Sequence, residues 1–326
     1  MKAIVYDKPG DESVLKLGDA PDPVPGPNEL LIDVRCASVN RADLMQRQGF
    51  YPAPPGASPI LGLDCAGEVI GKGDKVTGWS YGQRAMALLA GGGYAQKVAV
   101  DAGSAMPVPA VLNDEEAAAL PEVFLTAFLN LFMLGQVHPG ETALIHGGSS
   151  GVGTASIRLL SEAGARSIVT VGNDEKCERC RGFGADAAIN YKSGPFVDKV
   201  KDATNGRGAD IILDSIGAAY LEQNIAALAP EGRLILIGLM KGARSEIDLM
   251  AVLRRHLRII GSTLRMRPVE EKGRIVSTFL ARFGKELENG RLRPPIYKTL
   301  PIAEAAEAHR LMQSSHHFGK IVLRVS

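Results

Sequence analysis

A glycine-rich segment, residues 147–153, has the residue types and spacing of a phosphate-binding turn. It lies between an apolar run and an amphipathic run that favours a helix. Gly148 and Gly153 occupy the first and third positions of the pattern G-x-G-x-x-G, and Ser150 stands at the second. The serine hydroxyl must therefore lie near the phosphates, or the backbone must shift. Because a helix start offers unpaired N–H groups and a positive dipole end to a pyrophosphate, this context predicts dinucleotide binding. The alternative is a tight turn whose glycines serve only packing.

The end of the next predicted strand bears on which dinucleotide binds. That strand ends at Val171 and is followed by Gly172 and Asn173, so the carboxylate that holds the ribose 2′-hydroxyl of NAD is absent. Lys176 lies within the first turn of the following helix and can reach a 2′-phosphate, and Tyr191 could add a hydroxyl. The pattern favours NADP over NAD.

Two pairs of residues invite a metal or redox interpretation. Cys177 and Cys180 form a C-x-x-C pair with no second such pair beside it, and we interpret them as ordinary residues of a surface helix. His316 and His317 lie in a predicted loop and lack further ligands, so we interpret them as surface residues.

The elements that must position these residues fall into three stretches. Residues 1–120 hold short β-type runs separated by Gly and Pro, which favours a small, irregular β-barrel or meander. Residues 121–262 alternate apolar strands with helices, which predicts a doubly wound parallel sheet. Residues 263–326 hold a helix, a short strand, another helix and a last strand. We expect this stretch to return to the first domain, because its last strand needs a sheet to join.

Composition excludes several classes of protein. The chain has 326 residues, with 37 Lys and Arg against 36 Asp and Glu, so it carries no net charge that would indicate nucleic-acid binding. Its hydrophobic content of 45% permits a large core. No apolar run reaches the length of a signal peptide or a membrane span. Four cysteines do not make a disulfide framework, and we expect a reducing, cytoplasmic setting.

Several runs of the sequence resemble one branch of a known superfamily over essentially the whole chain. They are NRADLMQRQG (40–49), PPGAS (54–58), LTAF (125–128), SGVGTA (150–155), INYK (189–192) and GKIVL (319–323). The chain resembles the medium-chain dehydrogenases/reductases, and within them the zinc-free, zeta-crystallin-like quinone oxidoreductases. The similarity is greatest to their tumour-suppressor-inducible branch. The resemblance implies a GroES-like β-barrel catalytic domain and a Rossmann cofactor domain. It also implies NADPH-dependent, metal-free reduction of quinones, usually by a homodimer.

The same comparison shows what is missing. The zinc-dependent members of the superfamily carry a cysteine ligand after the second strand and a Gly-His-Glu motif some way beyond it. Asn40 stands at the cysteine position, and Gly62-Leu63-Asp64 stands in place of the motif. Since a catalytic zinc usually takes three Cys, His or carboxylate ligands from the protein, the loss of two predicts a metal-free site.

The resemblance also assigns roles to individual residues. Asn40 and Tyr51 are expected to line the nicotinamide and quinone cleft, and Thr126 to lie near the nicotinamide. Each has a plain alternative: a turn residue, a partly buried aromatic and a packed helical threonine. Met45 stands where some relatives carry an active-site tyrosine, which leaves the substrate preference open. The residues expected to border the cofactor are Gly148, Ser150, Gly151, Val152, Gly153, Gly172, Asn173, Lys176, Tyr191, Ser215, Gly217, Gly238, Leu239, Met240, Ser262, Thr263, Leu264 and Arg265.

Three functions remain open from the sequence. The leading one is an NADPH:quinone oxidoreductase acting on a small-molecule quinone. An enone or enoyl-thioester reductase on the same scaffold is the second, and it would need a proton donor that the sequence does not identify. The third is a non-catalytic NADPH-binding sensor or structural protein, which the lack of an obvious acid or base residue would suit.

Overall fold

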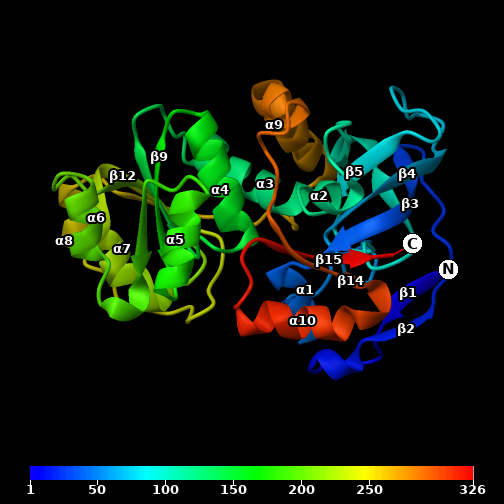
Figure 1. The fold of residues 1–326 in the computed structure, drawn as a ribbon, viewed down its shortest axis with the longest axis horizontal. Coiled ribbons are helices and arrows are strands. Elements are labelled where there is room, and N and C mark those ends of the chain that lie inside the picture. Colours follow the sequence, from blue (N-terminus) through cyan, green and yellow to red (C-terminus); the bar gives the residue numbers. More distant parts are fainter. Residues whose placement is uncertain (326) are drawn as a thin grey trace. The chain divides into compact units, whose positions relative to one another are not determined.

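The computed structural model describes residues 1–325, and the chain forms two compact units (Figure 1). Unit 1 consists of residues 1–125 together with the residues from Leu264 onward, and unit 2 consists of residues 126–263. The roles of catalytic and cofactor domain that the sequence suggested for these two parts of the chain stay predictions. Each unit is described by itself below.

Unit 1 is built on a seven-stranded sheet with the order β14-β15-β3-β4-β5-β7, in which β6 also pairs with β3. The strands are β3 (Glu29–Ser38), β4 (Asp64–Lys72), β5 (Arg84–Leu88), β6 (Lys97–Asp101), β7 (Ala105–Pro107), β14 (Ile296–Pro301) and β15 (Lys320–Arg324). The last strand, β15, pairs antiparallel with β3, with Val322 opposite Ser38. The two ends of the chain thus share one sheet, because β15 satisfies its backbone groups on an early strand.

A two-stranded ribbon and several helices complete unit 1. They are β1 (Lys2–Val5), β2 (Lys16–Asp19), α1 (Arg41–Arg47), α2 (Asp114–Ala118), α9 (Val269–Glu288) and α10 (Ala305–Ser314). Alternate residues of β3, among them Leu30, Ile32 and Val34, are buried in one core cluster. Leu44 of α1 and Ile321 of β15 pack in a second cluster. The irregular β-type runs of the sequence therefore bury one face of each strand, as alternation requires. Helix α3 (Pro121–Phe128) carries the chain from unit 1 into unit 2.

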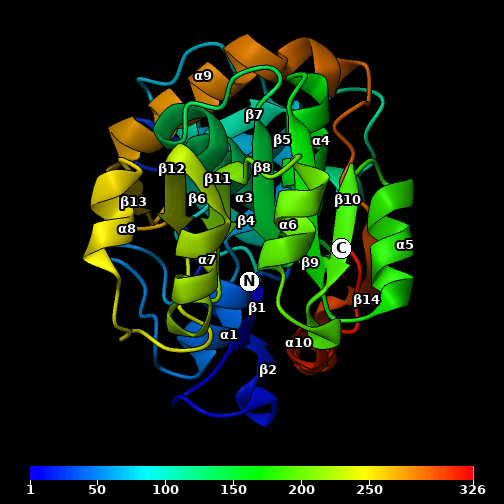
Figure 2. The same ribbon diagram turned by 90° about the vertical axis from the view of Figure 1, so that its left-hand side faces the viewer.

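Unit 2 is a six-stranded parallel sheet with the order β10-β9-β8-β11-β12-β13 (Figure 2). Its strands are β8 (Thr142–His146), β9 (Arg166–Val171), β10 (Ala187–Asn190), β11 (Ala209–Asp214), β12 (Leu228–Leu236) and β13 (Arg258–Gly261). Its helices are α4 (Gly151–Glu162), α5 (Asp174–Gly182), α6 (Val197–Ala203), α7 (Leu221–Ala227) and α8 (Leu249–Arg254). The predicted doubly wound sheet is confirmed. Strand order reverses between β8 and β11, and ligands of such folds bind at the carboxyl ends of strands beside that reversal.

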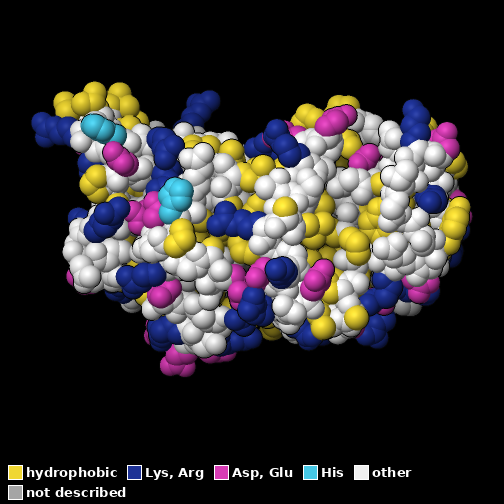
Figure 3. Space-filling view, turned by 90° about the horizontal axis from the view of Figure 1, so that it is seen from above, with side chains coloured by type: hydrophobic (Ala, Val, Ile, Leu, Met, Phe, Trp, Pro, Cys, Tyr) yellow, Lys and Arg dark blue, Asp and Glu magenta, His cyan; other side chains and the backbone are white. Residues whose placement is uncertain are grey.

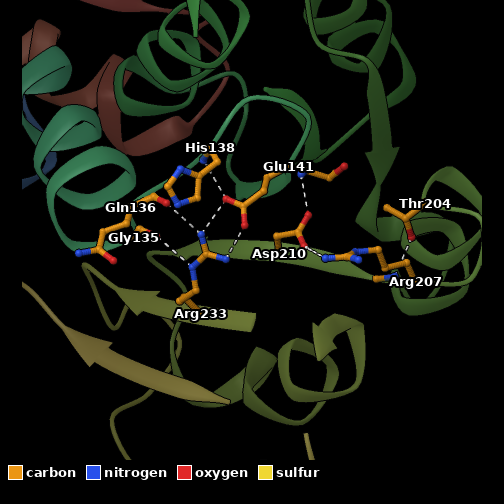
Figure 4. A network of polar contacts seen from close by, with 10 residues as sticks. Gly135, Gln136, His138, Glu141, Thr204, Arg207, Asp210 and Arg233 are labelled. Carbon is orange, nitrogen blue, oxygen red and sulfur yellow. Dashed lines mark hydrogen bonds and ion pairs between the residues drawn. The ribbon is translucent and has the colours of Figure 1, made fainter. Parts of the chain in front are cut away.

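Polar contacts fix the opposite, amino edge of this sheet (Figure 4). Arg233 of β12 donates from both Nη atoms to the two carboxylate oxygens of Glu141, each at 2.8 Å, and from Nε to the carbonyl of Gly135 at 2.9 Å. Asp210 of β11 accepts from the backbone N–H of Thr142 on β8 at 2.8 Å. These charge-assisted bonds tie three central strands together away from the carboxyl edge, so we assign them to stability.

Two sequence interpretations need correction. His317 is buried, not a surface residue, because it lies just before β15 and its ring packs 6.4 Å from that of Tyr297 on β14; His316 is exposed. Cys177 and Cys180 are also buried. Their three-residue spacing puts both on the inner face of α5, and burial raises the pKa of the Cys180 thiol to about 12. Neither thiol has the low pKa of a reactive cysteine.

None of the helices within residues 1–325 combines the length and the apolar character needed to cross a membrane.

Candidate active and cofactor sites

The glycine-rich turn joins β8 to α4, and its glycines are required by close contacts. A Cβ added to Gly148 would lie 2.4 Å from the Cβ of Val169 on β9. A Cβ added to Gly153 would lie 2.4 Å from the carbonyl oxygen of Gly147. The turn is thereby pressed against the neighbouring strand, and the start of α4 is pressed against the turn. These are the strand and helix approaches that a dinucleotide turn needs.

Ser150 is the N-cap of α4. Its Oγ accepts a hydrogen bond from the N–H of Gly153 at 3.0 Å, which gives this hydroxyl a capping function in the second position of the glycine pattern. The N–H groups of Gly151 and Val152, in the first turn, have no acceptor within the helix. Together with the positive end of the helix dipole, they form a place where a pyrophosphate can bind.

Four of the predicted residues meet where β9 and β10 end. Asn173 is the N-cap of α5 and its Oδ1 accepts from the N–H of Lys176 at 2.8 Å. A Cβ on Gly172 would lie 2.9 Å from the hydroxyl of Tyr191, so this ring stands directly over the glycine. The side chain of Lys176 is largely buried, and desolvation lowers the pKa of its ammonium. An anion at this position would offset that desolvation.

Sequence analysis missed a second lysine here. The Nζ of Lys241 lies 5.8 Å from the centre of the Tyr191 ring. Lys241 belongs to the loop after β12, and only the folded chain brings it to the end of β10. The nearby carboxylate of Asp174 accepts from Nδ2 of Asn190 at 2.9 Å.

The predicted residues after β11 and β12 lie in two loops that contact each other. Asp214 accepts from the N–H of Ile216 at 2.6 Å and so shapes the first loop. The N–H of Met240 donates to the carbonyl of Ser215 at 3.1 Å. Gly217 has a φ of +83°, and a Cβ there would lie 2.6 Å from the carbonyl oxygen of Gly242. Ser215, Gly217 and the segment 238–240 are therefore brought together at the carboxyl edge of the sheet.

A buried polar chain, also missed from the sequence, links this edge to the glycine-rich turn. Nε2 of His146 donates to Oδ1 of Asn224 at 2.7 Å, and Nδ2 of Asn224 donates to Asp214 at 3.0 Å. The other ring nitrogen, Nδ1, accepts from the hydroxyl of Thr170 at 2.9 Å. Burial lowers the pKa of His146 to about 4, so the ring is neutral near pH 7. His146 immediately precedes the turn, and the signal for its role was its place at the end of a strand.

The predicted segment 262–265 is divided between the units. Ser262 and Thr263 belong to unit 2, whereas Leu264 and Arg265 belong to unit 1. The guanidinium of Arg265 is buried and donates to the carbonyl of Ala90 at 2.8 Å, to Oε1 of Gln46 at 2.5 Å and to the carbonyl of Tyr51 at 3.4 Å.

Arg265 also lies 5.3 Å above the centre of the Tyr51 ring, close enough for a cation–π contact. Its contacts therefore hold the loop that carries Tyr51. Partial burial raises the pKa of the Tyr51 hydroxyl, so this phenol stays protonated at neutral pH. It can donate a hydrogen bond to a ligand.

Asn40, the other predicted residue of unit 1, sits in a buried polar cluster. Its Nδ2 donates to Oδ1 of Asp64 at 3.2 Å, and its Oδ1 accepts from Nζ of Lys320 at 2.5 Å. The hydroxyl of Ser38 donates to the same Asp64 oxygen at 2.6 Å. The end of β3, the start of β4 and the start of β15 supply these groups. Thr126, on α3 of unit 2, is buried, and its carbonyl accepts from Nδ2 of Asn130 at 2.7 Å.

Asp43 fastens Asn40 to its surroundings. The carboxylate accepts from the N–H of Asn40 at 2.8 Å, from the N–H of Gly62 at 2.9 Å and from the hydroxyl of Tyr94 at 3.3 Å. Burial raises the pKa of Asp43 to about 6 despite these bonds. Its contacts agree with the structural role expected for it.

This cluster does not fit a zinc ion. The amide of Asn40 and the aliphatic side chain of Leu63 stand where zinc-dependent relatives have a thiolate and an imidazole. The carboxylate of Asp64 is engaged by two hydrogen-bond donors, and the ammonium of Lys320 lies 3.6 Å from its other oxygen. Across residues 1–325 no group of three or more His, Cys, Asp or Glu side chains is arranged to hold a metal ion.

Comparison with known proteins identifies the family. The family model described as an alcohol dehydrogenase GroES-like domain matches residues 26–110, and the one described as a zinc-binding dehydrogenase matches residues 151–280. A phenolphthiocerol/phthiocerol polyketide synthase of Mycobacterium tuberculosis has one polypeptide that is 30% identical over 98% of this chain. The match covers 14% of that much longer protein.

Three solved structures share the whole fold. An NAD-dependent alcohol dehydrogenase is 32% identical, with a TM-score of 0.89 and full coverage of both chains. A mycobacterial protein solved in complex with NADPH is 28% identical, again with a TM-score of 0.89 and full coverage of both. A quinone oxidoreductase of Pseudomonas syringae is 25% identical, with a TM-score of 0.87 and 99% coverage of each chain.

The full-length match at 32% identity and the two family models agree with the folds of the two units. The GroES-like and Rossmann folds expected from the sequence are thereby confirmed. This chain belongs to the medium-chain dehydrogenase/reductase family of oxidoreductases.

Proposed function

We propose that this protein is an NADPH-dependent reductase of quinones that works without a metal ion, as in the zeta-crystallin-like branch of the family. The carrying observation is the end of β9, where Lys176 and Tyr191 meet in place of the carboxylate of an NAD site. NADPH would supply a hydride when bound. The mycobacterial relative solved with NADPH supports this cofactor. The alcohol dehydrogenase named as NAD-dependent makes the 2′-phosphate residues the deciding feature.

In this proposal each part of unit 2 has a share in holding the cofactor. The N–H groups of Gly151 and Val152 bind the pyrophosphate at the start of α4. Lys176, Lys241 and the hydroxyl of Tyr191 bind the 2′-phosphate, which lysine ammonium groups recognise as point charges. The two loops after β11 and β12 border the remainder of the nucleotide.

The substrate class follows from the residues at the former metal positions. An alcohol or a plain ketone needs a Lewis acid at its oxygen, whereas a quinone is already electrophilic. Asn40 and Tyr51 offer neutral N–H and O–H donors, which suit a quinone carbonyl. The protein then contributes orientation and exclusion of water. The Pseudomonas syringae quinone oxidoreductase supports this assignment.

A second candidate is reduction of an enone or an enoyl thioester. The polyketide synthase match over nearly the whole chain favours it, although the chain spans only about a seventh of that protein. Such a reaction needs a proton donor near the substrate carbon. Tyr51 is a phenol whose pKa is raised by burial, and it is the residue to test for that role.

One assay separates the candidates. NADPH oxidation is measured with 1,2- and 1,4-quinones, simple enones and crotonyl thioesters, with a chelator present. Turnover of quinones that the chelator leaves unchanged is the expected result. Turnover restricted to enones or thioesters establishes the second candidate, and tight NADPH binding without turnover indicates a sensor or structural protein. Stoichiometric zinc with activity lost to the chelator rejects the proposal.

We further propose that unit 2 pairs with a second copy of the chain. Strand β13 is the edge of its sheet, with Ile259 exposed, and Leu249 and Leu253 on the nearby α8 are each 70% exposed. Hydrophobic side chains show on the surface at the α8 end of the molecule (Figure 3). An unpaired edge strand beside exposed leucines is suited to two-fold pairing, which supports the homodimer implied by the resemblance.

A further inference from the structure

Lys320 is a buried cation at the first residue of β15. Its side chain is 1% exposed, although lysine is among the residues least often buried. Gly319, just before it, has a φ of +84°, and a Cβ there would lie 2.0 Å from the carbonyl oxygen of Pro295. The backbone is thus fixed immediately before the lysine, so the ammonium enters the Asn40 cluster from a rigid strand.

Three oxygen atoms surround this ammonium. Nζ of Lys320 donates to Oδ1 of Asn40 at 2.5 Å and to the carbonyl of Val39 at 3.3 Å, and it lies 3.6 Å from Oδ2 of Asp64. That Asp64 oxygen is buried and has no hydrogen-bond partner within residues 1–325. The lysine is therefore the nearby charge that compensates it. A second buried carboxylate, Asp43, lies close enough for its charge to interact with both.

These contacts determine which way round the Asn40 amide lies. An amide can present either its oxygen or its nitrogen to a ligand, and the two orientations are related by a half turn. Here the oxygen faces a group that can only donate, and one N–H faces a carboxylate that accepts. The reversed orientation would place the NH₂ against an ammonium. The second N–H of Nδ2 is the amide donor left for a ligand.

We propose that Lys320 is a positioning residue that takes the structural place of a metal ion, locking Asn40 as a hydrogen-bond donor toward the carbonyl of the acceptor. In zinc-dependent relatives the cysteine position binds a cation directly. Here the residue at that position, Asn40, contacts a cation supplied by β15, and the neighbouring carboxylate is neutralised without a metal. The inference rests on the proposed function, because it assigns Asn40 a carbonyl-bearing acceptor.

The test uses a charge-balanced pair of substitutions. Lys320→Met alone leaves the buried Asp64 carboxylate without its cation, so it is expected to lower the melting temperature and could prevent folding. Lys320→Met combined with Asp64→Asn removes both charges and is expected to restore the melting temperature. The double variant should still lose about tenfold or more in kcat with the quinone, because one oriented hydrogen bond is lost. The KM for NADPH should not change. Lys298→Met, on the neighbouring β14 and exposed, is the matched control and should leave all three quantities unchanged.

A cycle with Asn40→Ala shows whether Lys320 acts through Asn40. In the Asn40→Ala background the double substitution should cost no further kcat. Wild-type kcat in the Lys320→Met/Asp64→Asn variant, or independent losses that simply add in the Asn40→Ala background, would overturn the proposal.

A readout without turnover keeps the proposal separate from the assigned activity. In asparagine-labelled protein, the side-chain amide of Asn40, assigned by its disappearance in Asn40→Ala, should give two inequivalent, slowly exchanging proton signals. The double variant should lose that protection. If the wild type reduces no acceptor but these signals behave as expected, the proposed function fails and the amide lock stands. A freely exchanging Asn40 amide in the wild type refutes the lock.

Discussion

At the scale of single residues, the structure replaces a motif by a division of labour among side chains. Ser150 stands where the motif has a glycine and caps the helix. Asn173 stands where an NAD site has a carboxylate and caps the next helix. Such roles could not be predicted from the sequence, because a serine or an asparagine before a helix is compatible with both capping and ligand contact. The glycines could be predicted, since backbone approach excludes any other residue.

The preference for NADPH is predicted to depend on Lys176. Lys176→Ala should weaken NADPH binding by about 1.5–3 kcal/mol, the value of a charge-assisted hydrogen bond, and leave NADH binding almost unchanged. Lys241→Ala should act in the same direction with a smaller effect, since its ammonium is more exposed. Calorimetric titration with both nucleotides measures these changes, and Lys201→Ala, exposed on α6, is the control. Equal weakening of both cofactors would contradict the assignment of Lys176.

The neutral ring of His146 predicts sensitivity to acid. Its pKa is about 4 in the folded protein and about 6.5 in an unfolded chain, so between these pH values the unfolded state binds more protons. The stability that the neutral ring contributes is complete above about pH 6.5 and is lost as the pH falls toward 4. His146→Gln should therefore be less stable than the wild type at pH 7. That difference should shrink by about 1–3 kcal/mol at pH 4.5.

Urea unfolding at the two pH values measures that difference. Subtracting the wild-type and variant curves removes the contribution of Asp43, whose raised pKa acts in the opposite direction, and of His309, whose lowered pKa acts in the same direction. His316→Gln, on the exposed neighbour of His317, is the control. A stability difference that does not depend on pH would show that His146 is already charged in the folded state.

At the scale of elements, much of the chain could be predicted because local pattern and burial agree. The apolar strands β8 and β11 are fully buried, as strands of a parallel sheet covered on both faces must be. The burial of Cys177, Cys180 and His317 was predicted wrongly. A short polar helix and a loop before a strand carry weak periodicity, and the sheet that buries them is formed by distant residues. Lys241 and Lys320 escaped for the same reason, since each acts on a residue far away in the sequence.

The junction between the glycine-rich turn and α4 gives a prediction at this scale. In Gly153→Ala the new Cβ would meet the backbone of Gly147 and Gly148, which cannot move aside as a flexible side chain can. The start of α4 must shift, so the N–H groups of its first turn lose their alignment on the pyrophosphate. NADPH and NADH binding should weaken together by about tenfold or more, in contrast to Lys176→Ala.

Gly182→Ala is the control for this change. Gly182 ends α5, and no atom lies within 4 Å of an added Cβ. Affinity for both nucleotides should stay at the wild-type value in that variant, with a slight gain in stability. Unchanged affinity in Gly153→Ala would mean that the close approach serves packing alone, the alternative that the sequence left open.

At the scale of the whole molecule, an almost neutral chain places its exposed hydrophobic residues unevenly. Unit 1 ends its sheet with β7 and β14, whereas unit 2 ends with β13, which exposes Ile259 beside the leucines of α8. A monomer would leave the N–H and C=O groups of β13 to water and the leucines exposed. Pairing with the same surface of a second copy satisfies both, since a two-fold axis aligns two β13 strands antiparallel.

That arrangement predicts a dimer whose stability depends on concentration. Sedimentation should give about twice the mass of one chain, and the melting temperature should rise with protein concentration, because association stabilises only the folded form. Leu249→Glu combined with Leu253→Glu places two like charges where each meets its symmetry mate, so the double variant should sediment as a monomer. Leu17→Glu, at an exposed position on β2, should leave the dimer intact. The NADPH affinity of the monomeric variant should match that of the wild type, because the residues proposed for the cofactor lie on other elements of unit 2 than α8. A wild type that sediments as one chain at micromolar concentration would exclude this pairing and leave the exposed leucines without a partner.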